Sequence, residues 1–398
     1  MREYFTLNNI AEYSLYLTVF ILPFSMGIPN ILLGLCVFIF IIKAFKKEKF
    51  VFHKSLKTIV LLVVYLALNF TLKGELFSNI PMLGRLLIIP VFLVLLLQGS
   101  KENIFKTFWL SYVFLTVFVL FKIILYYFNY GDLLFNEIKE FHKLLFIDRP
   151  YFGFVSLLGL ILNIKYLQEY GKQKYLIYFL SLTSILLIYI VAARLTMLTI
   201  FILCFVFVFK KIQINVFKKV LILLSLSLLF VTSLVLNKNF INRLVINQGV
   251  ASFIDYEPRF VIWPCATKLI TEEAINSAVG SGGFTKTQQQ LCDCYEKNID
   301  NESKKEWYLE RKFNTHNQFL GFLLVGGIIG LIIFIYLLYQ LFQTSYKNTY
   351  MFSIWISFVL FLTLENIFYR QYGCYLIAVI VLFLTQEKNE KSKNSSHS

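Results

Sequence analysis

A histidine and an asparagine precede a long apolar run in the stretch THNQFLGFLLVGG, which covers Thr315–Gly327. The chain has only four histidines, so His316 is a rare residue type here. An imidazole has an ordinary pKa of about 6.5 and can exchange a proton near neutral pH, which a lysine cannot. His316 is either a proton carrier in a reaction or a structural residue at the start of a helix, and its type alone leaves both roles open.

Two arginines stand beside apolar sequence. Arg194 lies in YIVAARLTMLTI, between two apolar runs that almost no loop separates. In a membrane protein a charge at the boundary is costly and tends to mark a site, although arginine can also extend to lipid headgroups. Arg259 lies in EPRFVIWPCATKLI, where Pro258 and the apolar residues after it predict a short amphipathic helix along the membrane surface. Arg259 would stand in its first turn, or else simply pair with Glu257.

Two groups of glycines follow, AVGSGGF (Ala278–Phe284) and GFLLVGGIIG (Gly321–Gly330). The first is most simply a helix stop and turn. Its backbone amides, including those of Gly280 and Gly282, could instead hold an anionic oxygen. The second group permits close helix packing in a membrane.

The composition places these residues in a membrane protein. Hydrophobic residues make up 58% of the chain and charged residues 15%, and the mean hydropathy is +0.68. Ordinary globular proteins carry about 25% charged residues, which excludes a soluble domain. We therefore predict an all-α integral membrane protein with about twelve transmembrane helices, because uniformly apolar runs lack the alternation of a membrane barrel. The predicted segments are Tyr13–Ser25, Ile31–Phe45, Thr58–Leu72, Met82–Leu97, Phe108–Phe128, Tyr151–Leu167, Tyr175–Val191, Leu195–Phe209, Val220–Leu236, Phe319–Leu341, Met351–Ile367 and Tyr375–Leu384, with Gly27–Pro29 as either a hairpin or a break.

The distribution of charge predicts the topology. The net charge is +15, and cations cluster in short links at Lys43–Phe50, at Lys210–Lys219 and in the tail from Lys388. This is the positive-inside pattern of cytoplasmic loops, so the charge reports orientation and not a nucleic-acid partner. Twelve crossings would place both termini in the cytoplasm. The first apolar run is expected to stay as a helix and not to be a cleaved signal peptide.

Four regions follow from this topology. Residues 1–236 form an N-terminal transmembrane bundle of about nine helices, 237–316 one large outer loop, 317–385 the last transmembrane helices and 386–398 a disordered cytoplasmic tail. Acids and bases nearly balance in the large loop, as the positive-inside rule allows for a translocated segment. Loops of this length are usually functional, so we expect the active residues on that side.

The cysteines predict a disulfide and no metal site. Cys265, Cys292 and Cys294 lie in the large loop, where an oxidising compartment would permit one bond from Cys265 to either of the others. Cys36 and Cys204 lie in apolar runs and are most simply core residues. Cys-Asp-Cys without a second ligand pair is a poor metal signature, so no metal or other cofactor is expected.

The order of the motifs adds information that none carries alone. Arg194 starts a membrane helix, Arg259 and Trp263 form R-x-x-x-W, Gly280 and Gly282 form G-x-G, and His316 and Asn317 open H-N-x-x-L. In this order the chain resembles the O-antigen ligase and polymerase family of bacterial envelopes. The resemblance in membrane pattern covers nearly the whole chain, and its specific motifs lie between Arg194 and Gly330. It implies a C-type glycosyltransferase-like fold in the bacterial inner membrane, with the large loop in the periplasm and a donor glycan on undecaprenyl pyrophosphate.

The resemblance also implies roles for single residues. Arg194 and Arg259 would bind the pyrophosphate, because guanidinium groups donate several charge-assisted hydrogen bonds to phosphate oxygens. His316 would act as the general base towards the acceptor hydroxyl, with inversion at the anomeric carbon, or would orient that hydroxyl or bind phosphate as a cation. Further residues expected to contact substrate are Trp263, Gly280, Gly282 and Asn317, with Arg85 and Arg149 as either a basic funnel or headgroup contacts. Glu365 and Arg370 are expected to form a structural pair.

Several functions fit this pattern. Transfer of the glycan to lipid A–core is preferred, because the compact H-N-x-x-L ending and the single large loop look like the ligase subgroup. A polymerase that extends a second lipid-linked glycan uses the same donor chemistry, and so does a protein O-glycosyltransferase. A lipid-linked oligosaccharide flippase is the alternative from another class, but such transporters tend to have related halves around a midplane site.

Overall fold

The computed structural model describes residues 7–25, 27–45, 52–131, 133, 144–169, 174–211, 213–237, 257–271 and 275–385. Within these ranges no β-strand occurs, and one isolated bridge joins Asn276 to Gly280. The predicted tail 386–398 lies outside them, as do 46–51 of a lysine-rich link, most of the loop 131–150 and 238–256 of the large loop.

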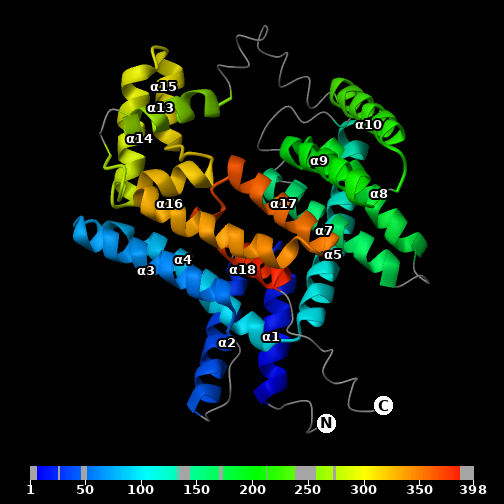
Figure 1. Ribbon diagram of the computed structural model, residues 1–398, viewed down its shortest axis with the longest axis horizontal. Helices are drawn as coiled ribbons and strands as arrows, with labels where there is room; N and C mark the ends of the chain where they lie inside the picture. The colour runs from blue at the N-terminus through cyan, green and yellow to red at the C-terminus, as the bar shows by residue number, and fades with distance from the viewer. Residues whose placement is uncertain are drawn as a thin grey trace.

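Twelve helices of the described part coincide largely with the twelve predicted apolar segments (Figure 1). They are α1 (Leu7–Ile21), α2 (Ile28–Phe45), α3 (Lys54–Leu72), α4 (Leu76–Gln98), α5 (Lys101–Tyr130), α7 (Arg149–Glu169), α8 (Lys174–Ile190), α9 (Arg194–Lys211), α10 (Val216–Leu236), α16 (Gln318–Ser345), α17 (Thr349–Leu364) and α18 (Gln371–Leu384). Seven of them, α2, α3, α4, α5, α7, α10 and α16, are long and apolar enough to cross a membrane. The all-helical architecture with several candidate spans is confirmed, and the number of crossings stays a prediction.

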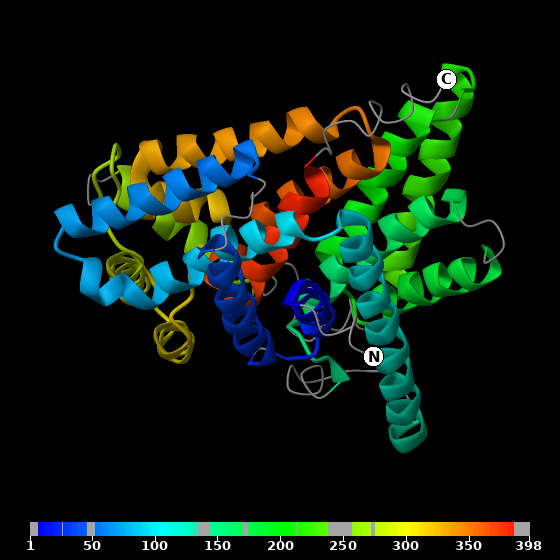
Figure 2. The same ribbon diagram turned by 90° about the horizontal axis from the view of Figure 1, so that it is seen from below.

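The core forms around α18, whose residues from Tyr372 to Leu384 are all buried. Helix α18 packs against α4, and α3 packs beside α16, so segments far apart in the sequence become neighbours (Figure 2). Helices α1 and α2 pack against each other, so the chain makes a hairpin before Ile28, and Ile28 and Pro29 already belong to the first turn of α2. By contrast α10 has one buried side chain, Leu223, as a helix surrounded by lipid would.

Lysines join helix ends that the predicted topology places on the cytoplasmic side. Lys101 at the start of α5 donates a hydrogen bond to the Thr385 carbonyl after α18. Lys210 of α9 donates to the Tyr346 carbonyl after α16, at 3.4 Å. Both contacts agree with the positive-inside pattern, and the identity of the side stays a prediction.

The described part of the large loop forms three helices, α13 (Arg259–Thr271), α14 (Phe284–Asn298) and α15 (Glu302–Arg311), which we call the cap. The cap lies at the end of α16 that begins at Gln318 (Figure 1). Ile262, Leu291, Tyr295 and Tyr308 form its buried core, together with Leu324 of α16. The cap is therefore packed onto the membrane helices through apolar side chains.

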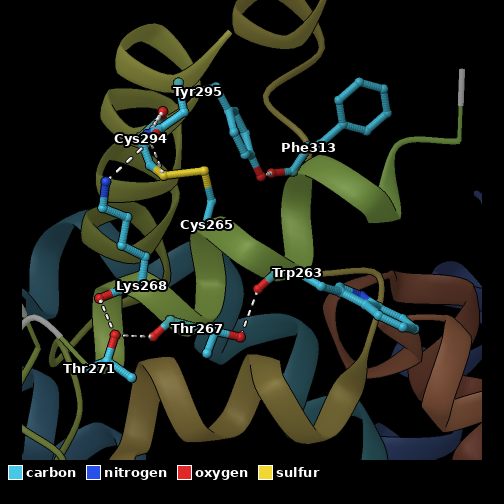
Figure 3. Close-up of a disulfide and its surroundings, with 9 residues drawn as sticks. Trp263, Cys265, Thr267, Lys268, Thr271, Cys294, Tyr295 and Phe313 are labelled. Atoms are coloured by element: carbon cyan, nitrogen blue, oxygen red, sulfur yellow. Dashed lines mark hydrogen bonds between the residues drawn. A yellow bond between two sulfur atoms is a disulfide. The ribbon is translucent and has the colours of Figure 1, made fainter. Parts of the chain in front are cut away.

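A disulfide joins α13 to α14 through Cys265 and Cys294 (Figure 3). This is one of the two predicted pairings. Cys292 is a buried free thiol, and its burial raises the pKa of that thiol. The Tyr295 hydroxyl donates to the Phe313 carbonyl at 3.2 Å, which ties α14 to the segment that leads to α16.

The predicted amphipathic helix exists as α13, but its apolar face lies inside the protein. Ile262, Cys265, Ala266 and Leu269 are buried among α14 and α16. The prediction that this face lies along the membrane surface is therefore wrong. Helices α14 and α16 supply the apolar partner that the membrane was expected to provide.

Candidate active site

Five charged or titratable side chains from four separate segments meet in what we call the charged cluster. Arg194 starts α9, Glu257 and Arg259 stand at the start of α13, His316 precedes α16 and Glu365 follows α17. Glu257 Oε1 lies 2.5 Å from Arg259 Nη1, and Glu257 Oε2 lies 3.9 Å from Arg194 Nη1. Glu365 Oε1 lies 3.8 Å from Arg259 Nη2, and Glu365 Oε2 lies 3.7 Å from His316 Nδ1. The fold thus brings together the three residues predicted to do chemistry.

The charged cluster is partly shielded from water. Exposed side-chain fractions fall from 32% for Arg194 to 11% for Glu365. Interactions between charges strengthen as water is excluded, so these contacts are stronger than surface ion pairs of the same length. Arg259 also donates to the Leu364 carbonyl at 3.0 Å, which fixes the plane of its guanidinium. Two guanidiniums therefore face two carboxylates in a partly buried setting.

The backbone of His316 is strained. Its φ of +42° lies in the left-handed region, which costs a residue other than glycine about 1–2 kcal/mol. Asn314 supports this conformation, because its side-chain oxygen accepts a hydrogen bond from the His316 N–H at 3.0 Å. The imidazole Nδ1 is buried and receives no hydrogen bond from the described residues, although Glu365 faces it. Such strain persists only where the surroundings impose it, and it is typical of functional sites.

Asn317 holds the start of α16. Its side-chain oxygen accepts hydrogen bonds from the N–H groups of Phe319 and Leu320, which makes it the N-cap residue. Its own N–H donates to Asn366 Oδ1 at 2.9 Å, and Asn366 Nδ2 donates back to the Asn317 carbonyl at 3.2 Å. The Asn317 side-chain oxygen is thus occupied by the end of α16, and Asn317 holds the backbone beside His316.

Trp263 fixes the same backbone from the other side. Its indole N–H donates to the Thr315 carbonyl at 3.0 Å, and Thr315 Oγ1 accepts from Asn366 Nδ2 at 3.0 Å. Trp263 lies on α13 four positions after Arg259. This hydrogen bond therefore couples the position of Arg259 to the position of His316.

The glycine-rich turn Ala278–Phe284 packs against α16 where that helix departs from helical geometry. The helix departs from helical geometry at Gly327, where φ is +64° and ψ is −166°. Ser281 donates to the Leu324 carbonyl at 2.8 Å and Gly282 donates to the Val325 carbonyl at 3.2 Å, so the turn satisfies acceptors that the break leaves open. The turn thus replaces a missing part of the hydrogen-bond pattern of α16.

This arrangement decides between the two interpretations of AVGSGGF. The Gly280 N–H donates to the Asn276 carbonyl at 2.7 Å, and the Gly282 N–H is used by α16. The prediction that the amides of Gly280 and Gly282 hold an anion is wrong, because protein carbonyls already accept from both. The turn interpretation is confirmed, with a packing role against α16.

A cavity of about 720 Å³ adjoins the charged cluster. Its lining includes Asn314 and Thr315, which immediately precede His316, but none of the five side chains of the cluster. Arg85 of α4 lines the cavity, and its Nη1 donates to the Tyr369 carbonyl at 3.2 Å. The cavity therefore offers a second compartment that begins next to His316.

The remaining predicted residues lie apart from the cluster. Arg370 lines the cavity and pairs with Asp148 at 2.6 Å. The predicted pair of Glu365 and Arg370 is therefore wrong, because Glu365 turns towards α13 and His316 while Arg370 turns towards the segment before α7. Arg149 starts α7 and belongs neither to the cluster nor to the cavity lining.

Two residues of the site were missed as functional candidates, Glu365 and Asn366. Both are buried, and they stand together directly after the apolar helix α17. Two adjacent polar residues at the end of a membrane helix are costly to bury, which was the available signal. The sequence could not show which other helix ends they meet.

Comparison with known proteins bears on the same region. A family model described as O-antigen ligase matches residues 179–335. Over these residues the chain is similar to the O-antigen ligase family. The matched residues include Arg194, Glu257, Arg259 and His316, whereas Glu365 and the α4 residues that line the cavity lie outside them. No curated protein matches the chain. The match to this family model and the apolar helices together support a multi-pass membrane protein with a ligase or polymerase type of function on lipid-linked glycans.

Proposed function

We propose that this protein, which is similar to the O-antigen ligase family over residues 179–335, transfers a glycan from undecaprenyl pyrophosphate to lipid A–core at the periplasmic face of the bacterial inner membrane. The observation that carries the proposal is the meeting of Arg194, Arg259 and His316 in one partly buried cluster, although they are far apart in the sequence. Neither a metal nor any other cofactor takes part in the proposed reaction.

The two arginines supply the binding site for the pyrophosphate. Glu257 lies between them and contacts both guanidiniums. A pyrophosphate carries more negative charge and more acceptor oxygens than one carboxylate, so it would take over these donors and move Glu257 aside. Donors fixed in advance stabilise the charge that develops on the leaving group, since they need no reorganisation in the transition state.

His316 supplies the base. The acceptor hydroxyl gives its proton to the imidazole, and its oxygen forms a bond to the anomeric carbon of the donor sugar. The bond between that carbon and the pyrophosphate oxygen breaks, and the electron pair leaves with the pyrophosphate between Arg194 and Arg259. A single displacement of this kind inverts the anomeric carbon. A base in the correct position contributes roughly 10²–10⁴-fold to the rate.

The cavity beside His316 is the proposed place for a glycan. Its volume of about 720 Å³ lies within the range of about 300–1,000 Å³ that is usual for ligand sites. The lining combines aromatic side chains such as Tyr151 and Tyr372 with amides such as Gln288 and Gln371. Rings can cover the apolar faces of sugars while amides bond to hydroxyl groups. Within this proposal Arg85 contacts the substrate, and Arg149 has no assigned role.

The test uses the purified full-length protein in detergent with labelled lipid-linked donor. Donor is incubated either with lipid A–core or with a second unlabelled lipid-linked glycan. Label on lipid A–core supports the ligase, and longer lipid-linked chains support the polymerase instead. A protein acceptor tests the O-glycosyltransferase. Movement of intact donor between leaflets of a vesicle, with no glycan joined to any acceptor, would show a flippase and overturn the proposal.

Variants then test the residue roles. Arg194→Ala, Arg259→Ala and His316→Ala are each expected to abolish product while the protein still inserts into membranes. Arg311→Ala is the matched control, since Arg311 is an exposed arginine of the cap with no contact to the charged cluster. Full activity of the first or second variant would remove that residue from the pyrophosphate site, and full activity of the third would remove the base.

A further inference from the structure

The cavity beside the charged cluster has an excess of positive charge. Three of its lining side chains are charged, Arg85, Asp148 and Arg370. Asp148 and Arg370 pair with each other at 2.6 Å, so their charges balance. Arg85 pairs with no carboxylate of the described part of the chain, and its Nη1 donates to the Tyr369 carbonyl at 3.2 Å. A guanidinium has five N–H donors, so Arg85 has donors left for a ligand.

Arg85 also stands far along a membrane helix. Helix α4 begins at Leu76, next to the cap. Asn79 in its first turns accepts hydrogen bonds from the N–H groups of Phe284 and Thr285 at the start of α14. At 1.5 Å per residue, Arg85 lies about 14 Å along α4 from that end, and α4 is apolar and long enough to cross a membrane. A charge at such a depth is costly and typically faces a functional cavity.

Two tyrosine hydroxyls supply further donors. Tyr151 of α7 and Tyr369, which follows α17, both line the cavity, and both hydroxyl oxygens are buried. Neither hydroxyl forms a hydrogen bond with another residue in the part of the chain that the structure describes. The whole Tyr151 side chain is 3% exposed. Nearly all buried hydroxyls in folded proteins are hydrogen-bonded, so a ligand with acceptor oxygens in the cavity would supply the missing partner.

We propose that the cavity binds an anionic group on the acceptor, a phosphate or a carboxylate carried by its sugars, and that Arg85 selects for it. The inference rests on the proposed function and names the class of acceptor. The guanidinium of Arg85 binds the anionic oxygens, and the hydroxyls of Tyr151 and Tyr369 donate to them. A neutral sugar would leave the excess charge of the wall without a counterpart.

The position of the cavity assigns it to the acceptor and not to the donor. The pyrophosphate of the donor is assigned to Arg194 and Arg259, and neither of them lines the cavity. Asn314 and Thr315 line it, and they immediately precede His316, the proposed base for the acceptor hydroxyl. A sugar in the cavity therefore presents its hydroxyl groups to His316 from the side opposite to the role of the two arginines.

The test measures equilibrium binding of lipid A–core to the purified full-length protein in detergent, without donor. The acceptor is used untreated, dephosphorylated with hydrogen fluoride, or with its carboxylates reduced to alcohols. The parent should bind at least one neutralised form about 10- to 100-fold more weakly, as expected for lost hydrogen bonds to a charged group. Arg85→Gln should bind untreated acceptor equally weakly and should no longer distinguish the three forms. Arg311→Gln, at an exposed arginine of the cap, is the matched control and should bind as the parent does.

Tyr151→Phe separates ligand binding from stability. Its hydroxyl has no hydrogen-bond partner among the described residues, so removing it should leave the melting temperature unchanged or raise it. Binding of untreated acceptor should weaken about tenfold, because the anion loses a donor. A lower melting temperature with unchanged binding would show that the hydroxyl serves the fold, and would remove Tyr151 from the site.

The remaining outcomes separate the inference from the proposed function. Equal binding of all three forms by the parent would overturn the inference, and so would an Arg85→Gln protein that still distinguishes them. A raised KM for the donor in Arg85→Gln, with unchanged acceptor binding, would place Arg85 in the pyrophosphate site and would also overturn it. Charge-dependent binding by a parent that joins no glycan would support the inference and reject the proposed function.

Discussion

Replacing Asn366 by alanine removes the side chain that holds His316 in place without touching His316 itself. Asn366 is 2% exposed. Its oxygen accepts from the Asn317 N–H at 2.9 Å, and its amide donates to the Asn317 carbonyl at 3.2 Å and to Thr315 Oγ1 at 3.0 Å. Asn366→Ala deletes all of these contacts at once.

The hydrogen bonds lost in Asn366→Ala determine how far kcat should fall. The Asn317 N–H loses its acceptor, and an unsatisfied buried group costs about 1–3 kcal/mol. The Asn317 carbonyl and the Thr315 hydroxyl lose less, because they keep a hydrogen bond to each other at 2.8 Å. The free energy lost with these hydrogen bonds is as large as the backbone strain of about 1–2 kcal/mol in the left-handed conformation of His316. We therefore expect the backbone to relax and kcat to fall by about 10- to 100-fold, at roughly tenfold per 1.4 kcal/mol.

The assay measures kcat for glycan joining and the melting temperature of the purified protein. Asn348→Ala is the control, because the Asn348 side chain also accepts backbone hydrogen bonds, from Tyr350 and Met351 at the start of α17, but lies away from His316 in the chain and forms no hydrogen bond with it in the described part of the protein. Loss of that cap costs about 1 kcal/mol of stability but leaves His316 untouched. An unchanged kcat in Asn366→Ala, or an equal fall in Asn348→Ala, would refute the reasoning.

Two further changes test the packing that supports the site. Gly280→Ala places a methyl group within 2.6 Å of the α16 backbone at a φ of +74°, and should lower the melting temperature by the equivalent of at least about 1–2 kcal/mol. Gly34→Ala, which has nothing within 4 Å, should not, and equal melting temperatures for the two variants would contradict the role of the turn. Cys294→Ser removes a bond that closes a separation of 29 residues, and should cost the cap about 3–4 kcal/mol in a thermal melt without reductant. Reductant should destabilise the parent and leave Cys294→Ser unchanged, and a parent that ignores reductant would show that the bond contributes nothing.

The helices were predictable because each depends on a local property of the chain. An apolar run long enough to cross a bilayer becomes a helix wherever it lies, since its backbone has no other partner in lipid. The twelve predicted segments therefore reappear in the structure. The apolar face of α13 was predictable as a face, but its partner was not, because the chain that covers it comes from α14 and α16.

The site was predictable only in part for the same reason. Arg194, Arg259 and His316 could be chosen because each is a costly or reactive residue beside apolar sequence. The actual partners of Glu365, and the importance of Asn366, depend on the end of α17 meeting α13 and the start of α16, which no local pattern encodes. The amides of Gly280 and Gly282 are not available to an anion because the Asn276 carbonyl accepts from the first and the Val325 carbonyl of α16 accepts from the second.

The contacts between the cap and the rest of the protein change the role expected for the large loop. In its described part, Trp263 donates a hydrogen bond to the Thr315 carbonyl and Tyr295 donates one to the Phe313 carbonyl. A disulfide also joins α13 to α14. The cap thereby brings Arg259 and His316 to Arg194, and this part of the loop needs no acceptor to explain it. The charged cluster lies largely within the matched residues 179–335, whereas much of the cavity wall comes from 78–85, 145–151 and 369–372. Chemistry shared by the family is thus expected to reside in the cluster, and the choice between lipid A–core and a second lipid-linked glycan in the wall of the cavity.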